Sequence, residues 1–280
     1  MIMTIASGKG GTGKTTVATN FARSLEAPVL LLDCDVEEPN AHLFIKPTLT
    51  ASQPVYKQIP EIDTDRCTGC GRCAELCAYN ALAVVKKKVL VFPDLCHGCG
   101  GCMLLCPEGA IREIGKEIGV VEQGQAEHID FVHGALHVGE VMAGPVITAV
   151  KKQREYHALV IVDAPPGTSC PVVGTLLDSD FCILVTEPTP FGLHDLRLAV
   201  DVVRKLHLPC GVIINRADLG DRNVETYCQD EGIPVLMRIP ADRRIAEAYS
   251  RGDMMVDAFP EYRQQFQQLL PTITQLVTQL

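Results

Sequence analysis

The sequence lacks three features that would point to common classes of protein. No apolar run approaches the roughly 18 residues of a membrane-spanning helix, and no basic leader precedes the short apolar N-terminus, so we expect neither a membrane anchor nor a secretion signal. Basic residues are fewer than acidic ones: the chain has 25 Lys and Arg and 34 Asp and Glu, which gives a net charge of -9. Nonspecific nucleic-acid binding depends on Lys and Arg, so we expect no nucleic-acid partner. The sequence predicts a soluble, cytoplasmic protein.

Cysteine, in contrast, is abundant. The chain has 13 Cys among its 280 residues, and disulfides are rare in the reducing cytoplasm. Metal binding is therefore the natural explanation for most of these thiols. The length of the chain allows one sizeable α/β core and a small second module.

A glycine-rich loop follows the first apolar run. Residues 7–16 satisfy the pattern G-x-x-x-x-G-K-[ST], in which backbone N–H groups surround phosphates, the lysine reaches the terminal phosphate and a hydroxyl contacts Mg²⁺. Apolar residues before the loop and at helical spacing after it predict a strand, a loop and a helix. The candidate nucleotide ligands are Gly8, Lys9, Gly10, Gly11, Thr12, Gly13, Lys14, Thr15 and Thr16, with Thr15 also contacting Mg²⁺.

The same glycines also spell G-x-G-x-x-G, the fingerprint of dinucleotide-binding proteins, and Asp33 ends the next apolar run as that fold requires. Lys14 and Thr15 directly after the last glycine favour a nucleoside triphosphate, because they supply a charge and a metal ligand that a nicotinamide dinucleotide does not use.

Two buried runs of residues end in acids. Val29–Leu32 precedes Asp33 and Asp35, and residues 158–162 precede Asp163. Because parallel strands end at one edge of a sheet, we expect Asp33 and Asp163 to hold Mg²⁺ through water, and carboxylates at this edge can also orient an attacking water. Solvated acids at a strand end are the alternative.

With Lys9 the loop has the form K-G-G-x-G-K-[ST], and together with Asp35 and Asp163 it resembles the MinD/ParA family of ATPases; Pro165 and Pro166 are closer to the Mrp branch. The resemblance implies a doubly wound, mostly parallel α/β sheet and Mg²⁺-dependent ATP hydrolysis. It also implies a nucleotide-dependent homodimer, or a heterodimer with a related ATPase, in which Lys9 reaches the partner's nucleotide. The residues implied in catalysis are Lys9, Lys14 and Asp35, and those implied around the base are Asn215, Pro240 and Asp242.

Eight cysteines form two copies of C-x₂-C-x₂-C-x₃-C, which is the signature of a bacterial ferredoxin with two [4Fe-4S] clusters. In that signature the fourth Cys of each run binds the other cluster. We therefore assign one cluster to Cys67, Cys70, Cys73 and Cys106, and the other to Cys77, Cys96, Cys99 and Cys102. Zinc is the main alternative, but two zinc sites would not need four thiols in each short run.

We expect residues 60–113 to form a small α+β ferredoxin-like domain inserted into an ATPase domain made of residues 1–59 and 114–280, with 51–61 as a linker. The insert lies between the two acidic segments that respond to a γ-phosphate. We therefore predict that nucleotide state and dimerisation are coupled to electron transfer through the clusters, to a redox or metal-cluster protein. Assembly or delivery of a metal cluster is one alternative, and a MinD-like positioning protein that carries clusters is another.

Several other features have simpler interpretations. The turn at Lys86–Lys88 is interpreted as solvated, with guidance of an acidic electron-transfer partner as the alternative. The tail from Glu261 is expected to be a packing helix interrupted at Pro271. The histidines His128, His133 and His137 are expected to be structural. Five cysteines lie outside the two runs: Cys34, Cys170, Cys182, Cys210 and Cys228. Most of them are expected to be small buried residues, and the role of Cys170 is left open.

Overall fold

The computed structural model describes residues 1–154 and 157–279. The chain divides into two compact units. Unit 1 comprises residues 1–52, 121–135 and 147–280, and unit 2 comprises residues 53–120 and 136–146. Each unit has a hydrophobic core of its own.

A mostly parallel sheet forms the centre of unit 1. Over the described residues its strand order is β11-β10-β9-β1-β8-β2-β7-β6-β3. The parallel strands are β11 (Val235–Ile239), β10 (Cys210–Asn215), β9 (Phe181–Thr186), β1 (Ile2–Ala6), β8 (Val160–Asp163), β2 (Val29–Asp33) and β7 (Ile129–Leu136). The predicted parallel α/β sheet is confirmed.

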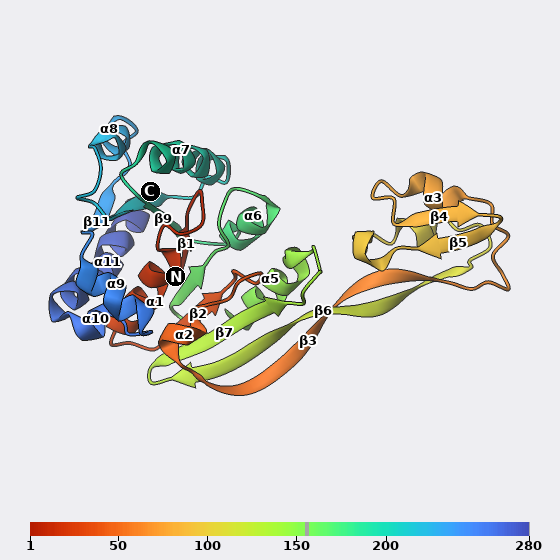
Figure 1. Ribbon diagram of the computed structural model, residues 1–280, viewed down its shortest axis with the longest axis horizontal. Coiled ribbons are helices and arrows are strands. Elements are labelled where there is room, and N and C mark those ends of the chain that lie inside the picture. Colours follow the sequence, from red (N-terminus) through yellow and green to blue (C-terminus); the bar gives the residue numbers. More distant parts are fainter. Residues whose placement is uncertain (155–156, 280) are drawn as a thin grey trace. The chain divides into compact units, whose positions relative to one another are not determined.

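Helices cover both faces of these strands, which explains why the central strands are apolar throughout. In β2, all the residues of Val-Leu-Leu-Leu-Asp are buried. One face carries α1 (Lys14–Ser24), α9 (Arg243–Ser250), α10 (Met255–Ala258) and α11 (Pro260–Thr278), and the other carries α6 (Cys170–Leu176), α7 (Pro190–Lys205) and α8 (Asn223–Asp230) (Figure 1). Two separate clusters of buried side chains lie beneath these layers, around Phe21 and Phe266 on the first face and around Leu184 and Val200 on the second.

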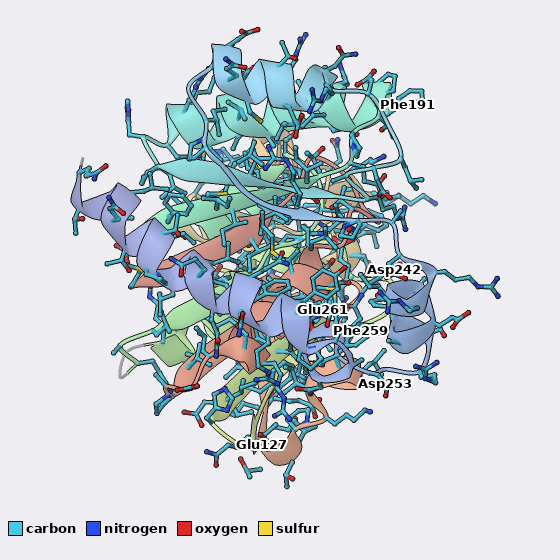
Figure 2. The ribbon with its side chains drawn as sticks, turned by 90° about the vertical axis from the view of Figure 1, so that its left-hand side faces the viewer. Glu127, Phe191, Asp242, Asp253, Phe259 and Glu261 are labelled. Atoms are coloured by element: carbon cyan, nitrogen blue, oxygen red, sulfur yellow. The ribbon has the colours of Figure 1, made fainter. Side chains whose placement is uncertain are left out.

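The last helix, α11, packs against unit 1 as predicted. Tyr262, Phe266, Leu269 and Ile273 are buried along it, and Figure 2 views the face that it covers. The helix continues through Pro271, so the predicted interruption was wrong. Packing of the apolar side chains on both sides of the proline offsets its missing N–H. No helix in the described ranges is long and apolar enough to cross a membrane.

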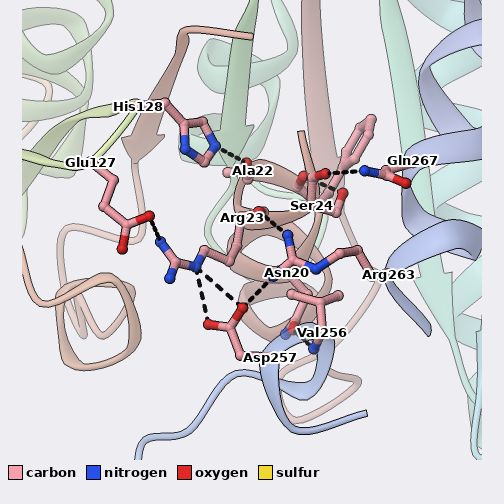
Figure 3. A network of polar contacts seen from close by, with 11 residues as sticks. Asn20, Ala22, Arg23, Ser24, Glu127, His128, Val256, Asp257, Arg263 and Gln267 are labelled. Atoms are coloured by element: carbon pink, nitrogen blue, oxygen red, sulfur yellow. Dashed lines mark hydrogen bonds and ion pairs between the residues drawn. The ribbon is translucent and has the colours of Figure 1, made fainter. Parts of the chain in front are cut away.

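Polar contacts fasten the end of α1 to a hairpin turn and to α10 (Figure 3). Arg23 lies 2.5 Å from Glu127 and 3.0 Å from Asp257, and His128 Nε2 lies 3.2 Å from the carbonyl oxygen of Ala22. Glu127 and His128 are the two-residue turn between β6 (Ile111–Ala126) and β7. A two-residue turn makes these strands an antiparallel hairpin, and the hairpin is thereby attached to the helix that follows the glycine-rich loop.

Unit 2 is built from short elements beside two long strands. It contains α3 (Arg72–Leu76), β4 (Leu82–Val85), β5 (Lys88–Val91), a 3₁₀ turn at Pro93–Leu95, α4 (Gly101–Leu104) and the continuing parts of β3 (Thr48–Ile62) and β6. Strands β4 and β5 form an antiparallel hairpin. At the entrance to the short elements, the N–H of Asp63 donates to the carbonyl oxygen of Ala110 at 2.8 Å.

The linker expected at 51–61 was wrong, because these residues lie within β3. Strand β6 has 16 residues and pairs with β3 in the sheet. Helix α5 (Ala143–Lys151) follows β7. The prolines in 51–61 broke the sequence pattern, but β3 is the last strand of the sheet, where a missing N–H is tolerated. The remaining short elements are α2 (His42–Ile45) and a 3₁₀ turn at Lys152–Arg154.

Candidate nucleotide site and cysteine-lined cavities

A cavity of about 440 Å³ opens in unit 1 where the parallel strands end. Ten of the residues predicted to bind nucleotide or to act in catalysis line it: Gly10, Gly11, Gly13, Lys14, Thr15, Thr16, Asp35, Asn215, Pro240 and Asp242. They come from segments far apart in the sequence, and the shared strand edge brings them together. Gly8, Lys9, Thr12, Asp33 and Asp163 are not in its lining.

The glycine-rich loop joins β1 to α1 in the form that an anion site requires. Gly11 and Gly13 have φ of 78° and 97°, a conformation that favours glycine. Gly13 caps α1 without a side-chain hydrogen bond, so the first N–H groups of the helix remain available to an anion. Gly8 serves packing, because a Cβ atom there would lie 2.2 Å from the carbonyl oxygen of Asp195.

Asp163 and Asp33 are buried side by side at the ends of β8 and β2. Burial, and then the charge of Asp33, raise the pKa of Asp163 well above its usual value, while Lys14 and the nearby hydroxyl of Thr15 oppose the shift. Neither carboxylate oxygen has a hydrogen bond of good geometry among the described residues. Asp33 differs, because its carboxylate accepts hydrogen bonds from the N–H groups of Asp35, Asn40 and Ala41 at 3.0–3.1 Å. Asp163 thus has the free oxygens that a cation site needs, whereas Asp33 holds the loop after β2.

Asp35 lines the cavity and is partly buried. Burial raises its pKa to about 6, although the positive charge of Lys14 opposes the shift. A carboxylate that titrates near neutral pH can exchange a proton with a nearby water, which is the chemistry of a general base.

Lys9 and Thr12 lie beside the cavity. Lys9 Nζ is 3.8 Å from the carboxylate of Glu187, and the carbonyl oxygen of Thr12 accepts a hydrogen bond from Asn215 Nδ2 at 2.8 Å. The Asp242 side chain caps α9 by accepting from the N–H of Arg244 at 2.8 Å.

Two charged residues near this site were missed from the sequence. Glu187 is mostly buried after β9 and accepts a hydrogen bond from Arg216, which lines the cavity, at 2.6 Å. The signal was present, because Glu187 and Arg216 directly follow strand ends of the parallel sheet, and Asp35 comes two residues after such an end.

The cysteine runs of unit 2 surround two cavities. One, of about 20 Å³, has Cys67, Cys70, Cys73 and Cys106 in its lining, and the other, of about 170 Å³, has Cys73, Cys77, Cys96, Cys99 and Cys102. Within residues 1–154 and 157–279, no group of three or more His, Cys, Asp or Glu is arranged to hold a metal ion. Zinc and [4Fe-4S] assignments therefore remain predictions.

Backbone groups already point at several of these sulfur atoms. N–H groups of Ala81, Gly98 and Ala110 donate to the sulfurs of Cys77, Cys96 and Cys106 at 3.3–3.4 Å. Four glycines within the runs have positive φ, a conformation that lets the chain turn tightly: Gly69, Gly71, Gly98 and Gly100.

The other cysteines and the three histidines lie outside both cavities. Cys34, Cys182 and Cys228 are buried, Cys210 is partly buried, and Cys170 is exposed at the first residue of α6. Each histidine has a hydrogen-bond partner: His128 contacts Ala22, His133 contacts Glu122 and His137 contacts Glu117.

Relatives were found by sequence and by structure. The sequence profile of the CobQ/CobB/MinD/ParA nucleotide binding domain matches residues 3–256. One uncharacterized protein of Methanocaldococcus jannaschii is 32% identical over 258 residues, 90% of each chain, and a second is 35% identical over 228 residues, 80% of each chain. The septum site-determining protein MinD of Pyrococcus horikoshii, solved with Mg-ADP, is 22% identical with a TM-score of 0.62, and the match covers 98% of this chain and 96% of that one. Since the profile spans most of the sequence and the glycine-rich loop joins β1 to α1 in a mostly parallel sheet, the chain belongs to the CobQ/CobB/MinD/ParA family of P-loop nucleotide-binding proteins.

Proposed function

We propose that this protein binds and hydrolyses ATP and couples its nucleotide state to electron transfer through two [4Fe-4S] clusters in unit 2. One observation carries the proposal: Cys106 lines the cavity of the first run and Cys77 lines the cavity of the second run, which is the crossing expected of the ferredoxin pattern, although Cys73 lines both cavities.

The nucleotide site supports the ATPase half. Lys14 and the free N–H groups of α1 would bind the phosphates, and Mg²⁺ would be held by Thr15 and, through water, by Asp163 and Asp33. The buried, unpaired oxygens of Asp163 fit a cation, which would compensate their charge. Asp35 would take a proton from the attacking water. Lys9 would reach the nucleotide of a second chain, either a copy of this one or a related ATPase.

The surroundings of the cysteines support the cluster half. Cys67, Cys70, Cys73 and Cys106 would hold one cluster, and Cys77, Cys96, Cys99 and Cys102 the other. When bound, such clusters accept and release single electrons. The chain's own contribution is to orient the thiolates and to direct N–H groups at the sulfurs, which tunes the potential.

Contacts within unit 1 support the coupling. Asp33 is in register with His133 on β7, and His133 Nε2 lies 2.9 Å from the carboxylate of Glu122 on β6. Strand β6 begins a few residues after Cys106 in unit 2 and continues into unit 1. A shift of the loop held by Asp33 would therefore reach β6 through His133 and Glu122.

The test is spectroscopic and is made on anaerobically purified protein. We expect about eight iron and eight sulfide per chain, and an electron paramagnetic resonance signal of the reduced protein that changes between Mg-ATP and Mg-ADP. Cys106→Ser should remove the signal of one cluster, and Cys210→Ser, outside both runs, should remove neither. Zinc in place of iron would contradict the cluster half, and a signal identical in both nucleotide states would contradict the coupling.

Cluster delivery is a second candidate. An iron-sulfur cluster carrier protein of Pyrococcus horikoshii is 29% identical over 134 residues, 40% of this chain and 45% of that protein. Incubation with an apo-acceptor protein distinguishes the two functions, because a carrier loses iron to the acceptor in an ATP-dependent way and an electron-transfer protein keeps it.

A further inference from the structure

Unit 2 distributes its positive charge unevenly. Four of its basic side chains have partners: Lys57 and Lys116 pair with Glu140, Arg112 pairs with Glu61, and Arg66 donates to the carbonyl oxygen of Glu108. The others have no ion pair among the described residues and are exposed; they are Arg72, Lys86, Lys87 and Lys88. In a chain of net charge -9, these uncompensated cations form a local positive surface.

This surface adjoins the cavity of the first cysteine run. Lys86 and Lys87 are the turn between β4 and β5, and a Cβ atom on Gly69 would lie 2.3 Å from the carbonyl oxygen of Lys87. Gly69 is between the thiols of Cys67 and Cys70, so the turn lies directly on the loop that carries them. Val89 and Arg72 line the same cavity.

The turn has lysine at two positions, Lys86 and Lys87, where Asn or Gly would suit the backbone conformation better. Lys86 and Lys87 have φ of 50° and 65°. Asn-Gly is the preferred pair for a two-residue turn of this kind. The backbone conformation does not favour lysine at these positions, which is consistent with a role for its charge.

The second cavity has no such surface. Lys57 and Lys116, which lie on the strands beside it, are paired with Glu140, and the carboxylate of Glu113 is among its lining residues. The first cavity also has one acid in its lining, Glu108. The positive surface thus belongs to one cysteine set and not to the other.

We propose that Lys86, Lys87, Lys88 and Arg72 form the docking surface for a one-electron carrier protein with an acidic surface, which exchanges electrons with the cluster of Cys67, Cys70, Cys73 and Cys106. This rests on the proposed cluster content. One electron leaves the carrier's reduced cofactor and reduces the oxidised cluster, or passes in the reverse direction, and no bond forms or breaks. Opposite charge brings the carrier to this edge of unit 2 and speeds the encounter.

The test is stopped-flow reduction of the oxidised holoprotein by a reduced flavodoxin of strongly acidic surface, over a range of ionic strength. The variant Lys86→Asn, Lys87→Gly, Lys88→Thr removes the charge and keeps the preferred turn residues. We expect its second-order rate constant at low salt to fall at least about tenfold, and its salt dependence to flatten. Replacing the three lysines by arginine should keep the wild-type rate.

A matched control removes the same charge from unit 1. The variant Lys152→Gln, Lys205→Gln, Arg222→Gln has the same net charge, and its three positions are exposed. Its reduction rate should stay near that of the wild type. Reduction by dithionite should be similar in all the variants that keep their iron, because a small reductant needs no docking surface.

The outcomes separate this inference from the proposed function. Protein without iron overturns both. Protein with both clusters and equal flavodoxin rates in the two triple variants overturns the docking surface alone. If the lysines were needed for binding to a DNA duplex or to phosphatidylserine vesicles and the reduction rates were unchanged, the surface would belong to another partner. That result would also overturn the docking of an electron carrier.

Discussion

Asp163 and Asp33 lie opposite each other, yet their carboxylates have different surroundings. Among the described residues, the oxygens of Asp163 accept no hydrogen bond of good geometry, whereas those of Asp33 accept three from the backbone. We expect Asp163→Asn to weaken the binding of Mg²⁺ needed for ATP hydrolysis, with activity reduced about 10- to 100-fold. Asp33→Asn should instead destabilise the fold by about 1–3 kcal/mol, because an amide nitrogen would face an N–H donor.

Magnesium titrations of hydrolysis and denaturant unfolding of both variants measure this difference. Equal loss of magnesium affinity in the two variants would show that Asp33 is as much a metal ligand as Asp163.

Two glycines of the same loop offer a second comparison. A Cβ atom on Gly8 would meet the carbonyl oxygen of Asp195 at 2.2 Å, whereas on Gly10 its nearest neighbour is Pro166 at 4.0 Å. We expect Gly8→Ala to lower the free energy of unfolding by about 1–3 kcal/mol through overpacking. Gly10→Ala should change it by less than about 0.5 kcal/mol. Thermal melts of the nucleotide-free proteins measure both, and equal melting temperatures would contradict the packing role of Gly8.

Motif spacing predicted ten of the residues that line the candidate nucleotide cavity, because the chemistry of phosphate binding restricts the residue types in that loop. It did not show that Asp33 holds the following loop, since that depends on how residues 35–41 fold back. Glu187 was also missed, because one acid after an apolar strand has many uses. The hydrogen-bond partners of an acid at a strand end depend on which strands lie beside it in the sheet, and the local sequence does not reveal that order.

A buried ion pair connects the segment after β7 to β3. Lys57 Nζ lies 2.9 Å from the Glu140 carboxylate, and the two side chains are 2% and 6% exposed. Burial alone would raise the pKa of Glu140, but hydrogen bonds from Lys116 and Lys57 outweigh it and lower the pKa. At pH 7 we expect Glu140→Gln to cost about 3–5 kcal/mol, because Lys57 is left buried without a partner charge.

The pH dependence follows from the sign of the shift. A lowered carboxyl pKa gives stability that is complete above the ordinary value of 4.5 and is lost as the pH falls through the lowered value. The difference between wild type and Glu140→Gln should therefore shrink below pH 4.5. Urea unfolding at several pH values tests it, with Glu117→Gln as an exposed control; a difference that stays constant on acidification would be the contrary result.

The long strand β3 could not be predicted from the sequence pattern, although the central strands could. The central strands were recognisable because burial on both faces requires continuous apolar runs. In β3 most residues before Ile59 are exposed, so no apolar face is visible, and two prolines suggest a break. Its pairing with β6 is set by residues about 60 positions away, which a local pattern does not contain.

Over the described residues, the buried clusters of unit 1 are large and those of unit 2 are small. Unit 2 has few buried apolar residues besides its cysteines, such as Ile59, Leu82 and Ile111. A unit of this size normally needs metal or other cross-links to be stable. We expect iron removal under anaerobic conditions to expose amides of residues 67–106 to hydrogen exchange, while β1, β8 and β9 in unit 1 stay protected. Mass-spectrometric exchange of the holoprotein and the apoprotein measures this, and unchanged protection of 67–106 would contradict it.

The short elements of unit 2 leave and rejoin the two long strands at adjacent points, where the N–H of Asp63 meets the carbonyl oxygen of Ala110. A gene encoding only the P-loop protein would need a single in-frame insertion, between the codons of two hairpin strands, to gain this segment. The strand order of the sheet would be the same before and after. The cysteine-bearing segment is therefore separable from the P-loop sheet at one pair of hydrogen-bonded positions, Asp63 and Ala110.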